Sequence, residues 1–230
     1  MDISLLELMN GQVGRSAIFD LFINNIYHSA LVKGTVLMLM FWSLWGRSDV
    51  LDSETRGRLL AVLVIAPITV TVARISAFIL PYRARPIHSD AVDVNYVNEG
   101  LHNYLDGWTS FPSDHAALFF CLSVSLFYVN RKIGVIALIY TTLIICLPRI
   151  YVGFHWPSDI LAGAFLGVAI AIALTPPVTK WMTRVYSGLM GTPAMGWLYP
   201  FLFLVTFQTA TLFIEARDAI SLLLKTITAL

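Results

Sequence analysis

The chain has 230 residues, of which 57% are hydrophobic and 13% charged, and its formal net charge is +1. Soluble domains carry about 25% charged residues, so this chain has about half the charge that a water-covered globule needs. The composition therefore excludes an ordinary soluble protein and an acidic disordered chain. The near-zero net charge, with no stretch rich in Lys and Arg, also excludes a nucleic-acid partner. A mean hydropathy of +0.75 indicates an integral membrane protein.

The apolar segments predict an all-α fold, a polytopic membrane helix bundle that forms one domain over residues 1–230. One transmembrane helix needs about 20 apolar residues, so the chain has room for about six. Residues 1–28 mix apolar and polar positions and predict one or two short interfacial helices. The six spans are predicted at about 29–45, 59–80, 112–129, 133–146, 158–174 and 197–213.

Prolines mark several of the predicted boundaries. Pro81 is expected to end the second span, and Pro176 and Pro177 the fifth, because proline lacks the N–H that continues a helix. The connecting segments are predicted as a charged loop over 47–58, a short connection over 147–157 and a linker over 179–196.

Two pairs of small residues lie inside the predicted spans. Gly163 and Gly167 have the G-x-x-x-G spacing, which indicates close helix packing within a bundle more often than a dimer seam. Cys121 and Cys146 lie in apolar runs and are interpreted as small core residues. A zinc site would need more ligands than these two cysteines, and a disulfide is not expected.

Residues 81–111 form the only long polar stretch of the sequence. A loop of this length in a small membrane protein is usually functional or disordered. Its aromatic residues, among them Tyr96, Tyr104 and Trp108, fit a lid over a lipid head group or plain anchors at the membrane interface.

The distribution of basic residues predicts the orientation in the membrane. Six spans place both termini, loop 81–111 and connection 147–157 on the same side. Apart from two arginines assigned to chemistry below, four basic residues lie on this side and seven on the other, so the positive-inside rule directs the long loop outward. The seven are Arg47, Arg56, Arg58, Arg131, Lys132, Lys180 and Arg184, and the four are Arg15, Arg83, Arg217 and Lys225.

Ionisable residues at membrane depth are costly and usually functional. Here they gather in three short stretches at the outward ends of spans two to five. The stretches are Arg83-Ala84-Arg85-Pro86, Pro112-Ser113-Asp114-His115 and Arg149-x5-His155-x3-Asp159.

These stretches carry the parts of a phosphoryl-transfer site. Arginine forks match phosphate oxygens, and a helix that begins at Ser113 offers free N–H groups to an anion. His155 and Asp159 are four residues apart, which permits a carboxylate to orient a nucleophilic imidazole. His115 is the candidate general acid. The set predicts phosphate chemistry that needs neither a metal ion nor another cofactor.

The three stretches resemble the three-part signature of the type-2 phosphatidic acid phosphatase superfamily, over about residues 59–178. The resemblance implies a six-helix membrane bundle and a metal-independent phosphatase acting on lipid phosphates or diphosphates. It also implies that His155 becomes a phosphohistidine, that Asp159 orients it, and that His115 protonates the leaving oxygen and then activates water. The phosphate ligands implied in this way are Arg85, Arg149 and Ser113, with Arg83 as a further candidate.

The sequence departs from the family pattern at three positions. Phe78 stands where the family usually has a lysine, and either Arg83 or Arg74 is a candidate substitute. Asp114 stands where glycine is common, and its carboxylate repels phosphate unless it turns away or pairs with an arginine. Pro148 replaces a serine.

The Pro-Ser-Asp-His form is similar to that of bacterial undecaprenyl-diphosphate phosphatases of the bacitracin-resistance type. The expected substrate is therefore undecaprenyl diphosphate, in a bacterial inner membrane with the site facing outward. Phosphatidylglycerol phosphate, phosphatidate and lipid A phosphates are alternative substrates, and a phosphotransferase would share every catalytic residue. A lipid-phosphate binder or transporter is the alternative of another class, and a vanadate haloperoxidase fits poorly with so many spans. The sequence leaves the oligomeric state open.

Overall fold

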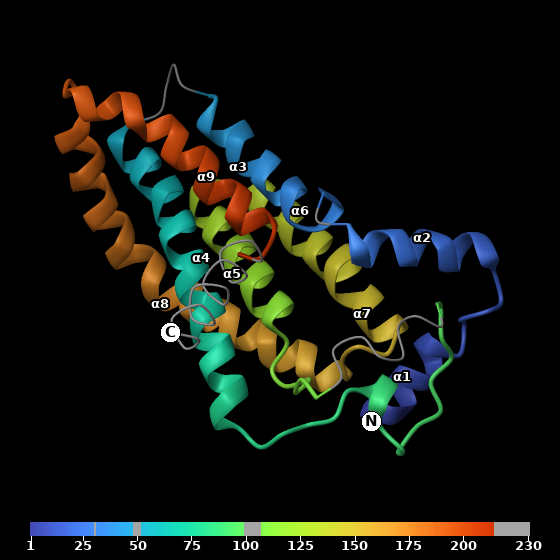
Figure 1. The fold of residues 1–230 in the computed structure, drawn as a ribbon. Coiled ribbons are helices and arrows are strands. Elements are labelled where there is room, and N and C mark those ends of the chain that lie inside the picture. Colours follow the sequence, from blue (N-terminus) through green and yellow to red (C-terminus); the bar gives the residue numbers. More distant parts are fainter. Residues whose placement is uncertain (30, 48–51, 99–106, 214–230) are drawn as a thin grey trace, which may run out of the picture.

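The computed structural model describes residues 1–29, 31–47, 52–98 and 107–213, and every regular element within these ranges is helical (Figure 1). The all-α prediction is therefore confirmed. Arg217, Lys225 and residues 99–106, which the predictions above use, lie outside the described residues. The principal helices are α1 (Asp2–Asn10), α2 (Ala17–His28), α3 (Val36–Trp45), α4 (Ser53–Ile79), α5 (Asp114–Val129), α6 (Arg131–Tyr140), α7 (Leu147–Tyr151), α8 (Pro157–Leu189) and α9 (Leu198–Ala210).

Shorter helical turns join some of these helices. A π-helical turn, Leu31–Thr35, leads into α3, and a second, Thr141–Cys146, joins α6 to α7 into one continuous segment. Two 3₁₀ turns, Pro86–His88 and Pro193–Trp197, lie in the connections after α4 and before α9.

Helix length and composition agree with a membrane bundle. Among the described residues, three segments are long and apolar enough to cross a membrane: Ser53–Ile79, Arg131–Tyr151 and Pro157–Leu189. Leu31–Trp45 and Asp114–Val129 are shorter apolar helices. α9 has 13 residues, or about 20 Å at about 1.5 Å per residue, against a hydrocarbon core of about 30 Å.

The predicted end of the fifth span is wrong. α8 continues through Pro176 and Pro177 to Leu189, so there is no linker beginning at residue 179. An internal proline costs a helix about 3 kcal/mol, and packing on α4 and α5 along the helix outweighs it. The second half of α8 contacts the start of α4, where a Cβ on Gly57 would lie 2.1 Å from Thr183 Oγ1.

Two other predicted connections are shorter than expected. The helix that follows Cys146 continues to Tyr151, because Pro148 stands in the first turn of α7, where a missing N–H is harmless. Arg149 therefore lies on a helix. α4 begins at Ser53 because Asp52 caps it, with the Asp52 carboxylate accepting from Thr55 N–H at 2.8 Å.

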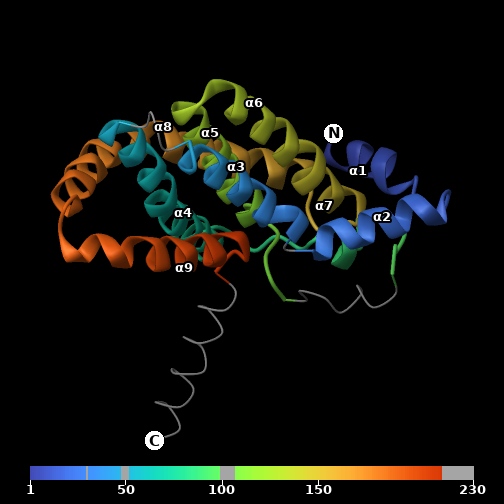
Figure 2. The ribbon, with the colours of Figure 1, turned by 90° about the horizontal axis from the view of Figure 1, so that it is seen from above.

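α8 packs against both α4 and α5, and these three helices form the centre of the bundle (Figures 1 and 2). The contact with α5 depends on the predicted glycine pair. A Cβ on Gly163 would lie 2.3 Å from the Ser113 carbonyl oxygen, and one on Gly167 would lie 2.1 Å from that of Ala117. The G-x-x-x-G spacing therefore does serve helix packing within the bundle, as predicted.

Cys121 and Cys146 are buried and unpaired, as predicted. Pro81 follows the last residues of α4, which ends at Ile79. This boundary agrees with the sequence prediction as well.

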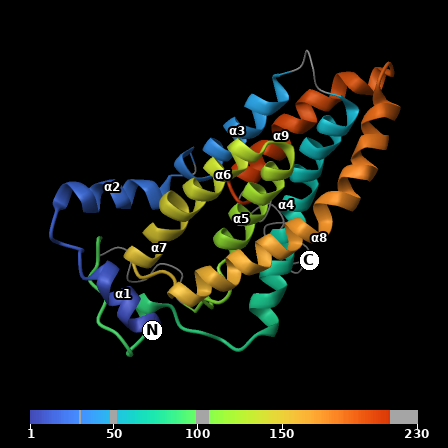
Figure 3. The same cartoon turned by 180° about the vertical axis from the view of Figure 1, so that it is seen from behind.

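The N-terminal helices lie at one end of the bundle. α1 sits beside the beginning of α8, and α2 runs across the end of α7 (Figure 3). The first part of the long loop packs here too, because Ile87 and Val94 are buried against Tyr151 and Phe154. Asn10 ties α1 to this loop through Asn95, with two hydrogen bonds of 2.8 and 3.0 Å. Residues 81–98 therefore form a wall at this end.

Candidate active site

The predicted site residues meet at the end of the bundle where α4 and α7 end and α5 and α8 begin. Ser113 caps α5 by accepting from Ala116 N–H at 3.4 Å. Its own N–H donates to the carbonyl oxygen of Asp159 at 3.2 Å. The beginnings of the second and third signature stretches are thus joined directly.

His155 lies in the turn between α7 and α8 and is 3% exposed. Its Nδ1 lies 2.9 Å from the carbonyl oxygen of Ser110. A carbonyl only accepts, so in the neutral ring Nδ1 carries the proton and Nε2 carries the lone pair. Arg85 Nη1 lies 3.4 Å from Nε2. An arginine donor therefore stands beside the nitrogen that a nucleophilic histidine would use.

Asp159 is fully buried in the first turn of α8, and its two oxygens bind different donors. Oδ2 accepts from the Trp156 N–H at 2.8 Å, and Oδ1 binds Arg83 Nη1 at 2.6 Å. The distance from Oδ2 to His155 Nδ1 is 3.7 Å, too long for a hydrogen bond. Asp159 therefore acts on His155 as a neighbouring charge, and the hydrogen bond that fixes the ring comes from Ser110.

The two arginines of the first stretch have different surroundings. Arg85 is buried, and its guanidinium donates to the carbonyl oxygens of Phe154 at 2.8 Å and Thr109 at 3.2 Å. Arg83 instead binds Asp159 and, through Nη2, Asp2 at 2.7 Å. These carboxylates direct Arg83 toward the start of α8.

Arg149 is 5% exposed on α7. Its charge acts on both His115 and His155. The third signature stretch therefore places a buried cation near both histidines.

The second stretch holds a second histidine and carboxylate. His115 Nδ1 lies 2.8 Å from Asp114 Oδ1, and Asp114 Oδ2 lies 2.5 Å from Arg74 Nη2. Of the two arrangements that the sequence left open for Asp114, the structure has the arginine pair. Arg74 comes from α4, eleven residues before Arg85.

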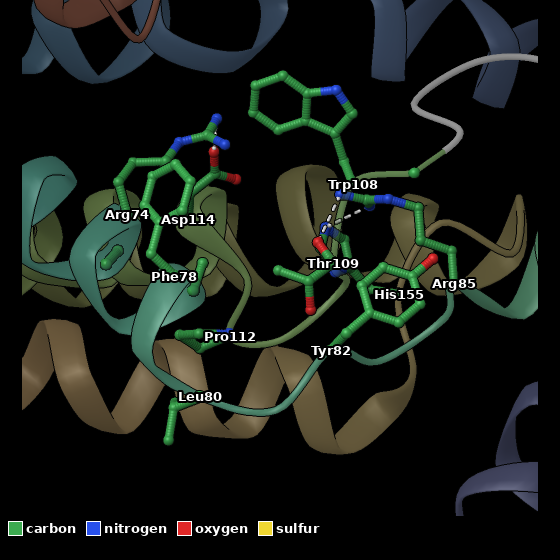
Figure 4. A pocket seen from close by; sticks show the side chains of 13 residues that line it. Arg74, Phe78, Leu80, Tyr82, Arg85, Trp108, Thr109, Pro112, Asp114 and His155 are labelled. Carbon is green, nitrogen blue, oxygen red and sulfur yellow. Dashed lines mark hydrogen bonds and ion pairs between the residues drawn. The ribbon is translucent and has the colours of Figure 1, made fainter.

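A cavity of about 450 Å³ opens between these elements (Figure 4). Arg85 and His155, two of the predicted site residues, line it. Arg74 and Asp114 form a second polar part of its wall. The guanidinium carbon of Arg74 lies 5.4 Å from the centre of the Trp108 ring. The cavity is lined by Ala73, Arg74, Ala77, Phe78, Leu80, Tyr82, Arg85, Gly107, Trp108, Thr109, Pro112, Asp114 and His155. Polar groups that converge beside an apolar wall suit a phosphate on an apolar tail.

Burial lowers the pKa of His155 below its ordinary value of 6.5. The Asp159 carboxylate opposes this shift of the pKa, and the positive charges of Arg85 and Arg149 add to it. The neutral ring, whose Nε2 can attack phosphorus, is thus favoured.

Three contributors to the site were not found from the sequence. The Ser110 carbonyl is a backbone group and carries no sequence signal. Asp2 lies far from every signature stretch, yet it binds Arg83 and caps α8 through the Ser158 N–H at 3.0 Å. Lys33 donates to the Tyr27 carbonyl at 2.7 Å and interacts electrostatically with Asp114 and His115. A lone lysine in an apolar span is a signal that could have revealed it.

Comparison with known proteins gives one family match. The model of the PAP2 superfamily matches residues 58–183, more than half of the chain. The match includes all three signature stretches.

Several curated proteins are similar to this chain. The bacitracin transport permease protein BcrC of Bacillus licheniformis is 31% identical over 142 residues, 60% of this chain and 66% of that protein. The undecaprenyl-diphosphatase BcrC of Bacillus subtilis (strain 168) is 31% identical over 87 residues, 35% of this chain and 45% of that protein. The match thus spans slightly less than two thirds of the first relative and less than half of the second. Lipid A 1-diphosphate synthase of Escherichia coli (strain K12) is 28% identical over 71% of this chain and 68% of that protein.

Among solved structures, the crystal structure of Aquifex aeolicus LpxE is similar, with a TM-score of 0.55 and 26% sequence identity. The similarity covers 75% of this chain and 93% of that one. The structural similarity covers more of the chain than the family model does. The two proteins therefore share the arrangement of helices beyond the region of the signature stretches.

Proposed function

Because the chain belongs to the PAP2 superfamily, we propose that it is an integral membrane phosphatase that acts on a lipid phosphate or diphosphate without a metal ion. The observation that carries this proposal is the setting of His155. Its Nδ1 is bound to the Ser110 carbonyl, and Arg85 stands beside its Nε2 at the wall of the cavity. A lipid-phosphate binder or transporter has no need of an imidazole whose lone pair is held next to a phosphate ligand.

In the proposed reaction, His155 Nε2 attacks phosphorus, and the bond from phosphorus to the leaving oxygen breaks. His115 gives that oxygen a proton, and the phosphate remains bonded to His155. His115 then takes a proton from water, whose oxygen attacks phosphorus and displaces Nε2. The products are the dephosphorylated lipid and inorganic phosphate, and both histidines return to their starting states.

Preorganised positive groups would stabilise the charge on the phosphoryl oxygens. Arg85 and Arg149 are buried where they act on His155, and the beginning of α5 adds the partial charge of a helix N-terminus. We assign these groups, with Ser113 at the cap, to phosphate binding. The Asp159 carboxylate, which is paired with Arg83, supplies a negative charge beside His155.

Undecaprenyl diphosphate is the substrate that we propose first, because one relative is named undecaprenyl-diphosphatase BcrC, and the bacitracin transport permease protein shares the name BcrC. The similarity to lipid A 1-diphosphate synthase favours a lipid A phosphate as the second candidate, with either water or another lipid as the acceptor. We place the protein in a bacterial inner membrane, since the relatives named above come from bacteria. The charge asymmetry between the two sides favours the outer face for the site.

The test is phosphate release by the purified protein in detergent, with EDTA present. The substrates are undecaprenyl diphosphate, undecaprenyl phosphate, phosphatidylglycerol phosphate, phosphatidate and lipid A diphosphate. We expect release from at least one of them, at a rate that EDTA leaves within about twofold. Loss of activity to EDTA that a divalent cation restores would contradict the metal-free reaction.

The same assay on sealed right-side-out vesicles tests the orientation. Lipid added from outside should be cleaved without detergent. Activity that appears only after the vesicles are opened would reverse the proposed topology.

The pKa of His155 sets a further expectation. Only the neutral ring attacks, and its lowered pKa keeps that form populated in mild acid. The acidic limb of kcat/KM should therefore lie below pH 6.5, and Arg85→Gln should move it upward by removing a cation beside the ring. Loss of Arg85 as a phosphate ligand should also lower the maximal kcat/KM, but that fall does not change the pH at which the acidic limb lies. A wild-type limb above pH 6.5 would contradict this.

A further inference from the structure

We propose that Asp114 is a positioning residue for His115 and that Arg74 holds Asp114 in that role. This inference rests on the proposed function, in which His115 passes a proton to the leaving oxygen and later takes one from water. The residues form a continuous chain from α4 to α5: Arg74 to Asp114 to His115.

The Asp114 carboxylate is held from three directions. Oδ1 accepts from the His115 backbone N–H at 2.8 Å and contacts His115 Nδ1 at 2.8 Å. Oδ2 binds Arg74 Nη2 at 2.5 Å. Asp114 is also in the first turn of α5, where the helix favours a negative charge. The carboxylate is therefore fixed on the Nδ1 side of the imidazole.

This contact defines which His115 nitrogen does the chemistry. With Nδ1–H donated to Asp114, Nε2 is the nitrogen that exchanges a proton with the leaving oxygen or with water. The carboxylate also offsets the positive charge that the ring carries whenever it holds both protons. A carboxylate that orients an imidazole in this way enhances catalysis by histidine in unrelated enzymes.

Arg74 makes such a carboxylate compatible with a phosphate site. Asp114 lies on the cavity wall, where its negative charge would repel the substrate, and the Arg74 guanidinium at 2.5 Å neutralises it. The centre of the Trp108 ring lies 5.4 Å from the guanidinium carbon of Arg74, within reach of a cation–π contact (Figure 4). Arg149 and Lys33 are the other cations that act on Asp114 or His115.

The two parts of the inference predict different losses. Asp114→Asn keeps the size of the side chain and removes its charge, so kcat should fall about 100-fold. KM should not rise and vanadate should bind at least as tightly as in wild type, because Arg74 is then an unpaired cation at the cavity wall. Arg74→Gln leaves Asp114 uncompensated, so vanadate, which mimics the transferring phosphoryl group, should bind about tenfold more weakly. In the double variant, vanadate affinity should return to within about threefold of wild type while kcat stays low.

The experiment measures vanadate binding by calorimetry and kcat and KM for the preferred lipid, with thermal unfolding as a check on folding. Glu54→Gln and Arg58→Gln are the matched controls, because this ion pair has the same 2.5 Å separation and lies outside the site. Neither control should change activity or vanadate binding.

Three results would overturn the inference. They are a kcat of Asp114→Asn within about threefold of wild type, a rise in its KM that accounts for the loss, or weak vanadate binding that persists in the double variant. The last result would make Arg74 a direct phosphate ligand. Failure of the proposed function is distinct, because then the wild-type protein releases no phosphate from any lipid.

Discussion

Replacing His155 by glutamine should abolish phosphate release, with a loss of about 10⁴-fold or more, because no other group takes over from a lost nucleophile. Glutamine is close in size to histidine and can still donate to the Ser110 carbonyl, which His155 Nδ1 contacts at 2.9 Å. The variant should therefore fold and still bind vanadate. Single-turnover assays on the preferred lipid, with thermal unfolding measured in parallel, provide the comparison.

His88→Gln is the control for this substitution. His88 lies on the same side of the bundle, in the 3₁₀ turn after Arg85, and has no role in the proposed reaction. Its variant should keep wild-type turnover. Turnover by His155→Gln within about tenfold of wild type would remove His155 from the role of nucleophile.

Replacing Gly163 by alanine should both destabilise the protein and reduce its activity. Alanine is the better helix former by about 1 kcal/mol, so propensity alone predicts a gain in stability. The new Cβ, however, would lie 2.3 Å from the Ser113 carbonyl oxygen and 3.0 Å from Ala116 Cβ. α5 and α8 must then separate, at a cost of about 1–3 kcal/mol. The separation also breaks the hydrogen bond from the Ser113 N–H to the Asp159 carbonyl, which joins the stretches that carry His115 and His155.

Gly188→Ala is the matched control on the same helix. A Cβ there has no heavy-atom neighbour within 4 Å among the described residues, so the substitution should leave activity unchanged. Thermal unfolding in detergent and kcat for both variants give the test. Equal stability and activity of Gly163→Ala and wild type would show that α5 and α8 can adjust without moving the site.

The sequence predicts the fold class and the neighbourhood of the site because both depend on local patterns. Apolar runs locate the helices, and the three charged stretches fall at one end because the chain alternates direction. The end of α8 is different. Pro176 and Pro177 are strong local stop signals, but contacts such as Gly57 against Thr183 come from residues more than 100 positions apart and hold the helix together.

The site shows the same division between local and long-range information. The i, i+4 spacing correctly brings Asp159 near His155, at 3.7 Å. The partner that actually hydrogen-bonds the ring is the backbone of Ser110, 45 residues away, and side-chain patterns do not record backbone carbonyls. Sequence spacing allowed either Arg74 or Arg83 to be the extra cation. The structure pairs each with a carboxylate, Arg74 with Asp114 and Arg83 with Asp159.

The contact between Asp2 and Ser158 has a consequence for biosynthesis. The two residues are separated by 156 positions, so α1 can dock only after nearly all of the preceding helices have been inserted and the start of α8 has left the ribosome. Closing a loop of this length adds little entropy beyond that of a shorter one, since the cost grows only with the logarithm of length. Order of synthesis, rather than stability, therefore makes the contact of Asp2 with Ser158 a late step of assembly. Asp159 lies on the same helix as Ser158, so until then Arg83 of the nascent chain also lacks this carboxylate partner.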